Sequence, residues 1–262
     1  MRKIGLFLFI VVIGATFLPL NSQETGKKEK EKKYSSSTSL SSVLARGNNR
    51  TFSFSVDTDH NFLLGRNLLN LKGSVIYSDQ NSGRRSEIYY SHLKYDLKVS
   101  SRAYLLGLVR AERNILAGYD FRSGFSLGAG YTWIQSKRIG VHSEGALGWS
   151  GERSSEKVLP GYPGDGGSII ERTISTSFLS SIVATKMTIN FSSAAQFTHD
   201  EIFFLNMSDL EAYRLNSYSS ISASVSRNFA LKTSLKIVYE NKPVQGYKNT
   251  DLYLLNSFVV KF

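Results

Sequence analysis

The stretch FRSGFSLGAGYTW, residues 121–133, alternates between large apolar side chains and small or polar ones. Its apolar parity includes Phe125, Leu127 and Trp133, whereas the other parity carries Arg122, Thr132 and three glycines. Because successive side chains of a β-strand point to opposite faces, this alternation predicts a strand with one apolar and one polar or open face. The strand is longer than the roughly five or six residues common in soluble sheets. It is long enough to cross a bilayer as a tilted strand.

The same alternation recurs from residue 36 to the last residue. It predicts an all-β fold, a transmembrane antiparallel up-and-down β-barrel of about twelve strands. We expect these strands at about 36–46, 51–63, 67–78, 86–99, 102–114, 121–135, 138–153, 169–184, 186–199, 211–228, 229–241 and 248–262.

The predicted connections alternate in length, which is typical of outer-membrane barrels with short periplasmic turns and longer outer loops. The short ones are expected at 65–66, 100–101, 136–137, 185 and 227–228. An even strand number places both ends of the barrel on the periplasmic side. None of the four prolines interrupts a predicted strand, as a hydrogen-bonded sheet requires.

The N-terminal part of the chain has a different composition. Arg2 and Lys3 precede an apolar run over residues 4–18, which predicts a signal peptide at residues 1–23 and export through the general secretion pathway. A retained signal anchor is the alternative. Residues 24–35 are rich in Lys and Glu and are expected to form a disordered tether. The barrel then occupies residues 36–262.

Composition narrows the class of protein. The chain has no Cys, which excludes disulfides, thiolate metal sites and Cys nucleophiles. The formal charge is +11, but the basic residues are not gathered into a stripe interleaved with aromatics, so a nucleic-acid partner is not expected. A soluble lipocalin-like barrel or sandwich is the alternative fold. It would need an apolar core, and the predicted inward face is too polar to supply one.

The last predicted strand ends in an aromatic residue after alternating apolar positions. This resembles the C-terminal signal of outer-membrane barrels, and its residues are Leu254, Phe258, Val260 and Phe262. Expected partners are therefore outer-membrane lipid, the barrel-assembly machinery and periplasmic chaperones. The oligomeric state is left open.

If the apolar parity faces lipid, a set of charged residues faces the lumen. These candidates are Lys72, Lys94, Asp96, Lys98, Arg110, Glu112, Arg122, Glu144, Glu152, Arg214, Lys232, Lys236 and Glu240. Basic residues outnumber acidic ones, which favours a narrow porin-like channel for small solutes with a mild preference for anions. The alternative is a structural or stress-related envelope barrel in which the charges pair and plug the lumen. Residues 154–168 form either a constriction loop or a surface loop.

A membrane-embedded lipid hydrolase is a further alternative, because such an enzyme needs a nucleophile beside a histidine. His199 with Asp200, approached by Thr198 or Ser193, is the only plausible constellation, since His60, His92 and His142 are expected near the periplasm or in the lumen. No cluster of metal ligands stands out. We therefore expect no enzymatic activity, no metal and no cofactor.

The central motifs resemble those of a known family. They are Glu112-Arg113, Gly118-Tyr119-Asp120-Phe121-Arg122 and residues 127–131, with Asp251 and Phe262 near the end. They are similar to the signature of the YdiY-like proteins, a domain of unknown function numbered 481 that is often labelled salt-induced outer-membrane protein. The resemblance spans residues 36–262 and implies an outer-membrane barrel. It carries no biochemical activity over to this chain.

Overall fold

The computed structural model describes residues 33–46, 51–79, 85–158 and 170–262. The predicted signal peptide and residues 24–32 of the predicted tether lie outside these residues, and the last two residues assigned to the tether, Tyr34 and Ser35, belong to the first strand. The strands are β1 (Tyr34–Arg46), β2 (Thr51–Leu64), β3 (Asn67–Asp79), β4 (Arg85–Lys98), β5 (Ala103–Asn114), β6 (Tyr119–Gln135), β7 (Ile139–Val158), β8 (Ile170–Asn190), β9 (Ala195–Asn206), β10 (Tyr213–Ser224), β11 (Phe229–Glu240) and β12 (Thr250–Lys261). A short 3₁₀ turn, η2 (Ile115–Ala117), separates β5 from β6.

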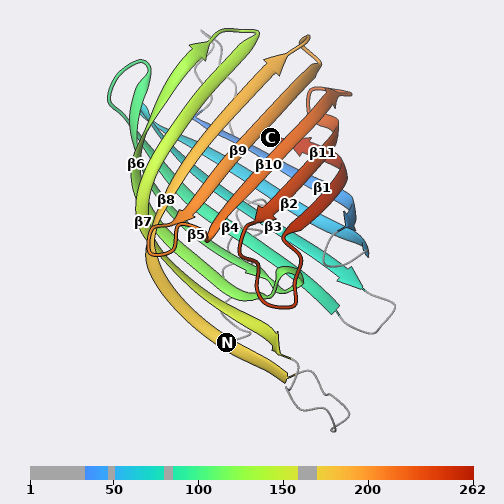
Figure 1. Ribbon diagram of the computed structural model, residues 1–262. Coiled ribbons are helices and arrows are strands. Elements are labelled where there is room, and N and C mark those ends of the chain that lie inside the picture. Colours follow the sequence, from blue (N-terminus) through green and yellow to red (C-terminus); the bar gives the residue numbers. More distant parts are fainter. Residues whose placement is uncertain (1–32, 47–50, 80–84, 159–169) are drawn as a thin grey trace, which may run out of the picture.

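The twelve strands form one closed antiparallel barrel (Figure 1). Each strand pairs with its neighbours along the chain, and β1 pairs with β12 from Ser37↔Lys261 to Arg46↔Leu252. Closure leaves no unpaired sheet edge, which a strand protein in lipid requires. The predicted fold class is confirmed.

The structure corrects one predicted turn. Residue 185 does not end a strand, because β8 runs on to Asn190 and the turn follows at 191–194. Met187 and Ile189 continue the apolar parity of β8, whereas the Ser192 hydroxyl accepts hydrogen bonds from the backbone N–H groups of Ala194 and Ala195. These side chain–backbone bonds favour a turn at Ser192 over a continued strand.

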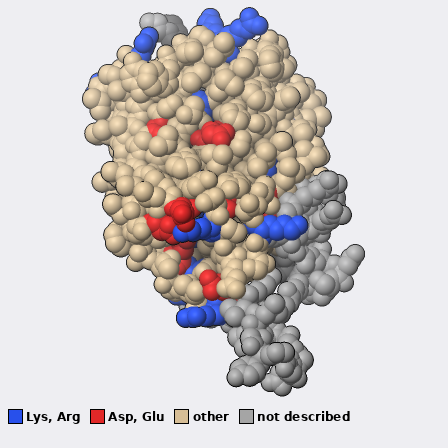
Figure 2. Space-filling view, in the orientation of Figure 1, with Lys and Arg blue, Asp and Glu red and all other residues tan. Residues whose placement is uncertain are grey.

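The two faces of the barrel differ as the alternation predicts. Large apolar side chains are exposed on the outside, such as Trp133 at 58%, Leu147 at 58% and Phe125 at 50%. Small polar residues on the opposite parity are buried, for example Ser126 and Ser234, both 1% exposed. The face shown in Figure 2 is mostly uncharged in its upper half, where basic groups lie at the top and a few acidic groups lie within the uncharged area, and acidic and basic groups lie together lower down. An apolar exterior around a polar interior is the arrangement of a membrane barrel rather than of a soluble one.

The described residues contain no helix that is both long and apolar enough to cross a membrane.

Candidate functional site

The strands are joined by longer loops at one end of the barrel, the loop end, and by short turns at the other, the turn end. Ion pairs cross the half of the interior at the loop end. Arg122 of β6 reaches Glu240 of β11, with its Nη1 2.8 Å from Oε1 and its Nη2 3.2 Å from Oε2. Because β6 and β11 are not neighbours in the barrel, this contact spans the lumen. Arg122 Nε also lies 3.1 Å from Glu152 Oε1, and the Tyr119 hydroxyl donates to Glu240 at 2.7 Å. Arg122 and Glu240 are 8% and 7% exposed, so the pair is buried inside the barrel.

Two further arginines flank Phe204 of β9. The guanidinium carbons of Arg110 and Arg214 lie 4.4 and 4.3 Å from the centre of its ring. Arg214 also approaches Glu112 across the lumen at 3.5 Å. Within the described residues, Arg110 Nη1 and Arg214 Nε are buried without a hydrogen-bond partner. Both arginines also line a cavity of about 80 Å³.

Glycines on the inward face of β6 let long side chains pass over that strand. Arg110 of β5 donates to Ser150 of β7 at 3.0 Å, and Tyr104 donates to Glu144 of β7 at 2.7 Å. A Cβ atom at Gly124 would lie 2.8 Å from Arg110 Nε, and one at Gly130 would lie 2.2 Å from the Tyr104 ring. The small inward-facing residues of 121–133 therefore leave room for the side chains of Arg110 and Tyr104 to pass over β6 and reach β7.

The turn half of the interior holds a lysine-centred network. Lys94 bonds Glu144 of β7 and lies 3.3 Å from Asp96. Lys72 pairs with Asp59 at 3.4 Å, and Lys186 pairs with Asp200 at 3.5 Å. His92 is 2.7 Å from Asn70 Oδ1 and 2.9 Å from the Tyr90 hydroxyl, which places this histidine within the polar filling.

Some predicted lumen cations have no carboxylate within 4.0 Å in the part of the chain that is described. Lys232 and Lys236 instead lie over the rings of Tyr218 and Tyr253, at 5.1 and 5.6 Å. Lys98 sits exposed at the turn end. Sequence reasoning missed further inward residues, and these are mainly acidic: Lys186, Lys261, Asp57, Asp59, Asp200 and Asp251. The total charge of the lumen-facing side chains is therefore close to balanced.

The turn η2 folds into the loop end of the lumen. Leu116 packs with the inward residues Ile76 and Ile88 and with Tyr253 and Leu255 of β12. Beside it, Ala117 and Tyr119 contact Val244 of the β11–β12 loop. Gly118 allows this fold, because its φ of 84° is left-handed and a Cβ there would lie 2.6 Å from the Tyr247 ring. The η2 turn therefore narrows the lumen at the loop end. Of the loop predicted at 154–168, residues 154–158 belong to β7, and the rest lies outside the described residues.

The loops at the same end are tied together by Lys242. Its Nζ lies 2.9 Å from Asp209 Oδ2 and 2.9 Å from Glu211 Oε2, both in the β9–β10 loop. Lys242 also lines the arginine cavity. The hydrogen bond from Lys242 lowers the pKa of Asp209, and the hydrogen bond to Asp209 raises the pKa of Lys242. We call this contact between Lys242 and Asp209 the clamp. Both of its groups are charged between the two pKa values, and therefore also at neutral pH.

Replacing Lys242 with glutamine is expected to raise the pKa of Asp209 back toward that of a free aspartate. The contact is lost on acidification only as pH falls through the lowered pKa of Asp209, because its folded pKa lies below the unfolded one. A ¹³C NMR titration of the Asp209 carboxyl group in wild type and K242Q measures this shift. Lys248→Gln serves as the control in the same loop. An Asp209 midpoint that K242Q leaves in place would contradict the clamp.

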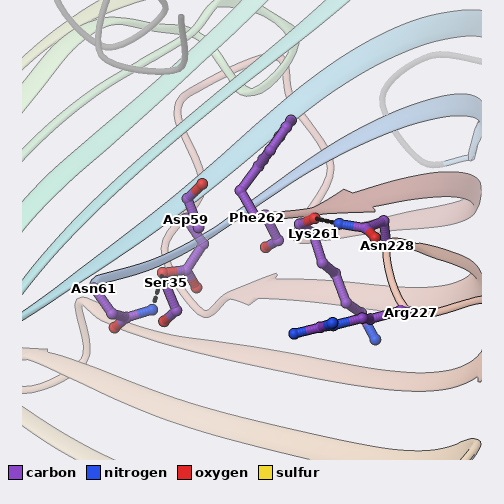
Figure 3. Close-up of a pocket in the computed structure, with 9 residues that line it drawn as sticks. Ser35, Asp59, Asn61, Arg227, Asn228, Lys261 and Phe262 are labelled. Atoms are coloured by element: carbon purple, nitrogen blue, oxygen red, sulfur yellow. Dashed lines mark hydrogen bonds between the residues drawn. The ribbon is translucent and has the colours of Figure 1, made fainter. Parts of the chain in front are cut away.

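A cavity of about 380 Å³ lies at the turn end, where Ser36 and Phe262 exchange backbone hydrogen bonds (Figure 3). Asp59, Arg227 and Lys261 line it, and the Asn228 amide donates to the Lys261 carbonyl at 3.1 Å. The open space is thus larger at this end than at the arginine cavity.

The predicted hydrolase constellation does not form. Asp200 points inward to Lys186, and the Thr198 hydroxyl contacts Ser220. His199 lies midway along the outward face of β9 rather than at the rim, 2.8 Å from Ser219 Oγ and 3.1 Å from Glu201 Oε2.

The family model described as "Protein of unknown function, DUF481" matches residues 38–262. The chain belongs to the DUF481 family. The match covers nearly the whole barrel, so the resemblance of the central motifs is confirmed. None of the curated protein sequences matches the chain.

The DUF481 barrel is similar in fold to several solved structures. The NanC porin in a rhombohedral crystal form is 6% identical with a TM-score of 0.54, over 85% of this chain and 98% of that chain. The COG4313 outer membrane channel from Pseudomonas putida F1 is 12% identical with a TM-score of 0.48, over 92% and 100%. The translocator domain of autotransporter NalP from Neisseria meningitidis is 9% identical with a TM-score of 0.47, over 100% and 96%. At 6% identity, the likeness to the NanC porin shows the fold alone.

Proposed function

We propose that this DUF481 barrel is a narrow outer-membrane channel that passes small anions. The observation that carries this proposal is the pair of arginines around Phe204, which line the loop-end cavity. Arg214 is paired with Glu112, whereas Arg110 has no carboxylate within 4.0 Å among the described residues and donates to Ser150. A buried cation without a carboxylate partner attracts an anion and repels a cation in a low-dielectric lumen. Lys232 and Lys236 extend the same bias along the wall between β10 and β12.

The lumen is narrow in this conformation. The Arg122–Glu240 pair crosses it, and the Leu116 cluster fills the space beside that pair. A permeant would have to be small, and passage would require the η2 turn to shift and the ion pair to part. The larger cavity at the turn end would then act as the inner vestibule.

The cellular setting is part of the proposal. The chain would be exported as a precursor and inserted with both barrel ends in the periplasm. The assembly machinery would read Leu254, Phe258, Val260 and Phe262, all on the outward parity of β12 beside the closing seam. Enzymatic activity and a cofactor are not part of this function.

Current across a planar bilayer tests the channel. In a KCl gradient, we expect the reversal potential of the wild-type protein to lie toward that of chloride. The double variant Lys232→Glu/Lys236→Glu should remove or invert this shift, because it places carboxylates beside Tyr218 and Tyr253. Lys137→Glu, on an exposed periplasmic turn, is the matched control and should change little. Cation preference in wild type would contradict the anion channel.

A plugged structural barrel is the second candidate, and the cross-lumen ion pairs and the Leu116 cluster favour it. Leu116→Ser separates the two functions. If η2 gates a channel, loosening its apolar contacts should raise the open probability. Barrels of wild type and L116S that are both silent at all voltages would support the structural role.

A further inference from the structure

Four hydroxyl or carboxylate residues lie side by side on the outer wall of the barrel. Ser143 of β7 is directly opposite Thr185 of β8, Thr185 is opposite Glu201 of β9, and Glu201 is opposite Ser217 of β10. The Ser143 and Thr185 hydroxyls are 3.0 Å apart. His199 and Ser219 form a second pair beside Glu201. We call these six residues the polar row.

The polar row lies within the apolar band and not at its rim. On each strand, apolar side chains of the same outward parity flank the row on both sides. The flanking residues are Val141 and Leu147 on β7, Val183 and Met187 on β8, Phe197 and Phe203 on β9, and Leu215 and Ile221 on β10. A rim position would have an apolar neighbour on one side only, so the row sits at the depth of the hydrocarbon.

This placement is costly if the row faces lipid. About a third of each side chain of His199 and Glu201 is exposed, at 33% and 37%. Hydrocarbon offers no hydrogen bonds to the remaining carboxylate and hydroxyl lone pairs, and an ionisable group at this depth is strongly unfavourable without a partner. The outward walls of β3, β4 and β5 carry Leu71, Val75, Leu93, Leu97 and Val109 at comparable positions. A second outward polar set, Thr233, Asn256 and Ser42 on β11, β12 and β1, contains no carboxylate. The polar row therefore differs from these other outward walls in carrying the carboxylate of Glu201.

We propose that the polar row is a membrane-embedded interface with a second copy of this chain. The row contains both donors and acceptors, so it is complementary to itself, as a two-fold interface requires. Small residues on the same wall allow close approach, since Gly145 has open space at its Cβ position and Ser181 lies on the outward face of β8. The wall of β7, β8, β9 and β10 would face its counterpart, with hydroxyl and carboxylate groups bonding across the contact. This interface is independent of the proposed channel.

Cross-linking in a bilayer tests the interface, and the absence of native Cys makes single reporters clean. Full-length protein carrying Ser143→Cys, Thr185→Cys or Ser217→Cys is reconstituted in phosphatidylcholine and phosphatidylglycerol vesicles and oxidised. We expect a disulfide-linked dimer from at least one of these positions. Val109→Cys, an exposed position on the outer wall of β5, is the control and should stay monomeric.

A second variant separates loss of the interface from loss of the fold. His199→Leu/Glu201→Leu makes the row apolar, which suits lipid but removes the groups that bond across the contact. We expect it to abolish the dimer while keeping the heat-modifiable migration of a folded barrel and the single-barrel conductance. Thr233→Leu, the same kind of change on the outer wall of β11, should leave the dimer intact. Single-molecule photobleaching that finds only monomers, or equal cross-linking at Val109→Cys, would overturn the proposal.

Discussion

Replacing Glu240 with glutamine is expected to lower the free energy of unfolding by about 3 kcal/mol, the lower end of the cost of breaking a buried ion pair. Arg122 would keep only the more exposed carboxylate of Glu152 as a charged partner. Glu240 accepts hydrogen bonds from Arg122 and from the Tyr119 hydroxyl, and all three groups are buried. Arg214 also lies 3.9 Å away. Urea unfolding of the barrel in lipid vesicles, followed by tryptophan fluorescence, measures the change.

The double variant Arg122→Met/Glu240→Met shows whether the cost comes from the stranded charge. It should be markedly more stable than the single variant, because apolar side chains of similar volume carry no charge to desolvate. Glu152→Gln is the comparison on the same arginine, and it should cost less because its carboxyl group is more exposed. A double variant that is no more stable than Glu240→Gln would contradict the stranded-charge explanation.

Replacing Gly130 with valine is expected to destabilise the barrel by about 1–3 kcal/mol, the usual cost of overpacking. The new Cβ atom would lie 2.2 Å from Cζ of Tyr104 and 2.5 Å from its hydroxyl oxygen. Tyr104 would have to leave Glu144, which would then lose the hydrogen bond that the tyrosine donates. The same unfolding measurement detects the change.

Gly107→Val is the matched control for this substitution. Gly107 lies on the adjacent strand β5, opposite Leu127, and a Cβ atom there would make only an ordinary contact, 3.6 Å from a Leu127 methyl group. Valine at this position points away from the lumen and should be neutral or slightly stabilising in lipid. If both valines cost the same, backbone preference rather than the Tyr104 crossing would explain the effect.

The alternation of apolar and polar side chains predicts most of the architecture, because it shows for each strand which residues face outward and which face inward. The twelve strands, the short turns at Gly65 and near Ser100, and the lipid-facing parity of β6 are all readable along the chain. The turn at 191–194 was misplaced at residue 185 because hydroxyl residues occur in both strands and turns. That shift also misplaced His199 at the rim and hid Lys186 and Asp200 from the lumen set.

The sequence by itself determined that this chain is a barrel with a polar inside and an apolar outside, since that information is local and repeats every two residues. Which charges meet was decided only by the tertiary structure. Arg122 and Glu240 are 118 positions apart and come together through closure and strand register. The Leu116 turn and the polar row depend on the same closure, because both join residues from strands whose relative height no local pattern records.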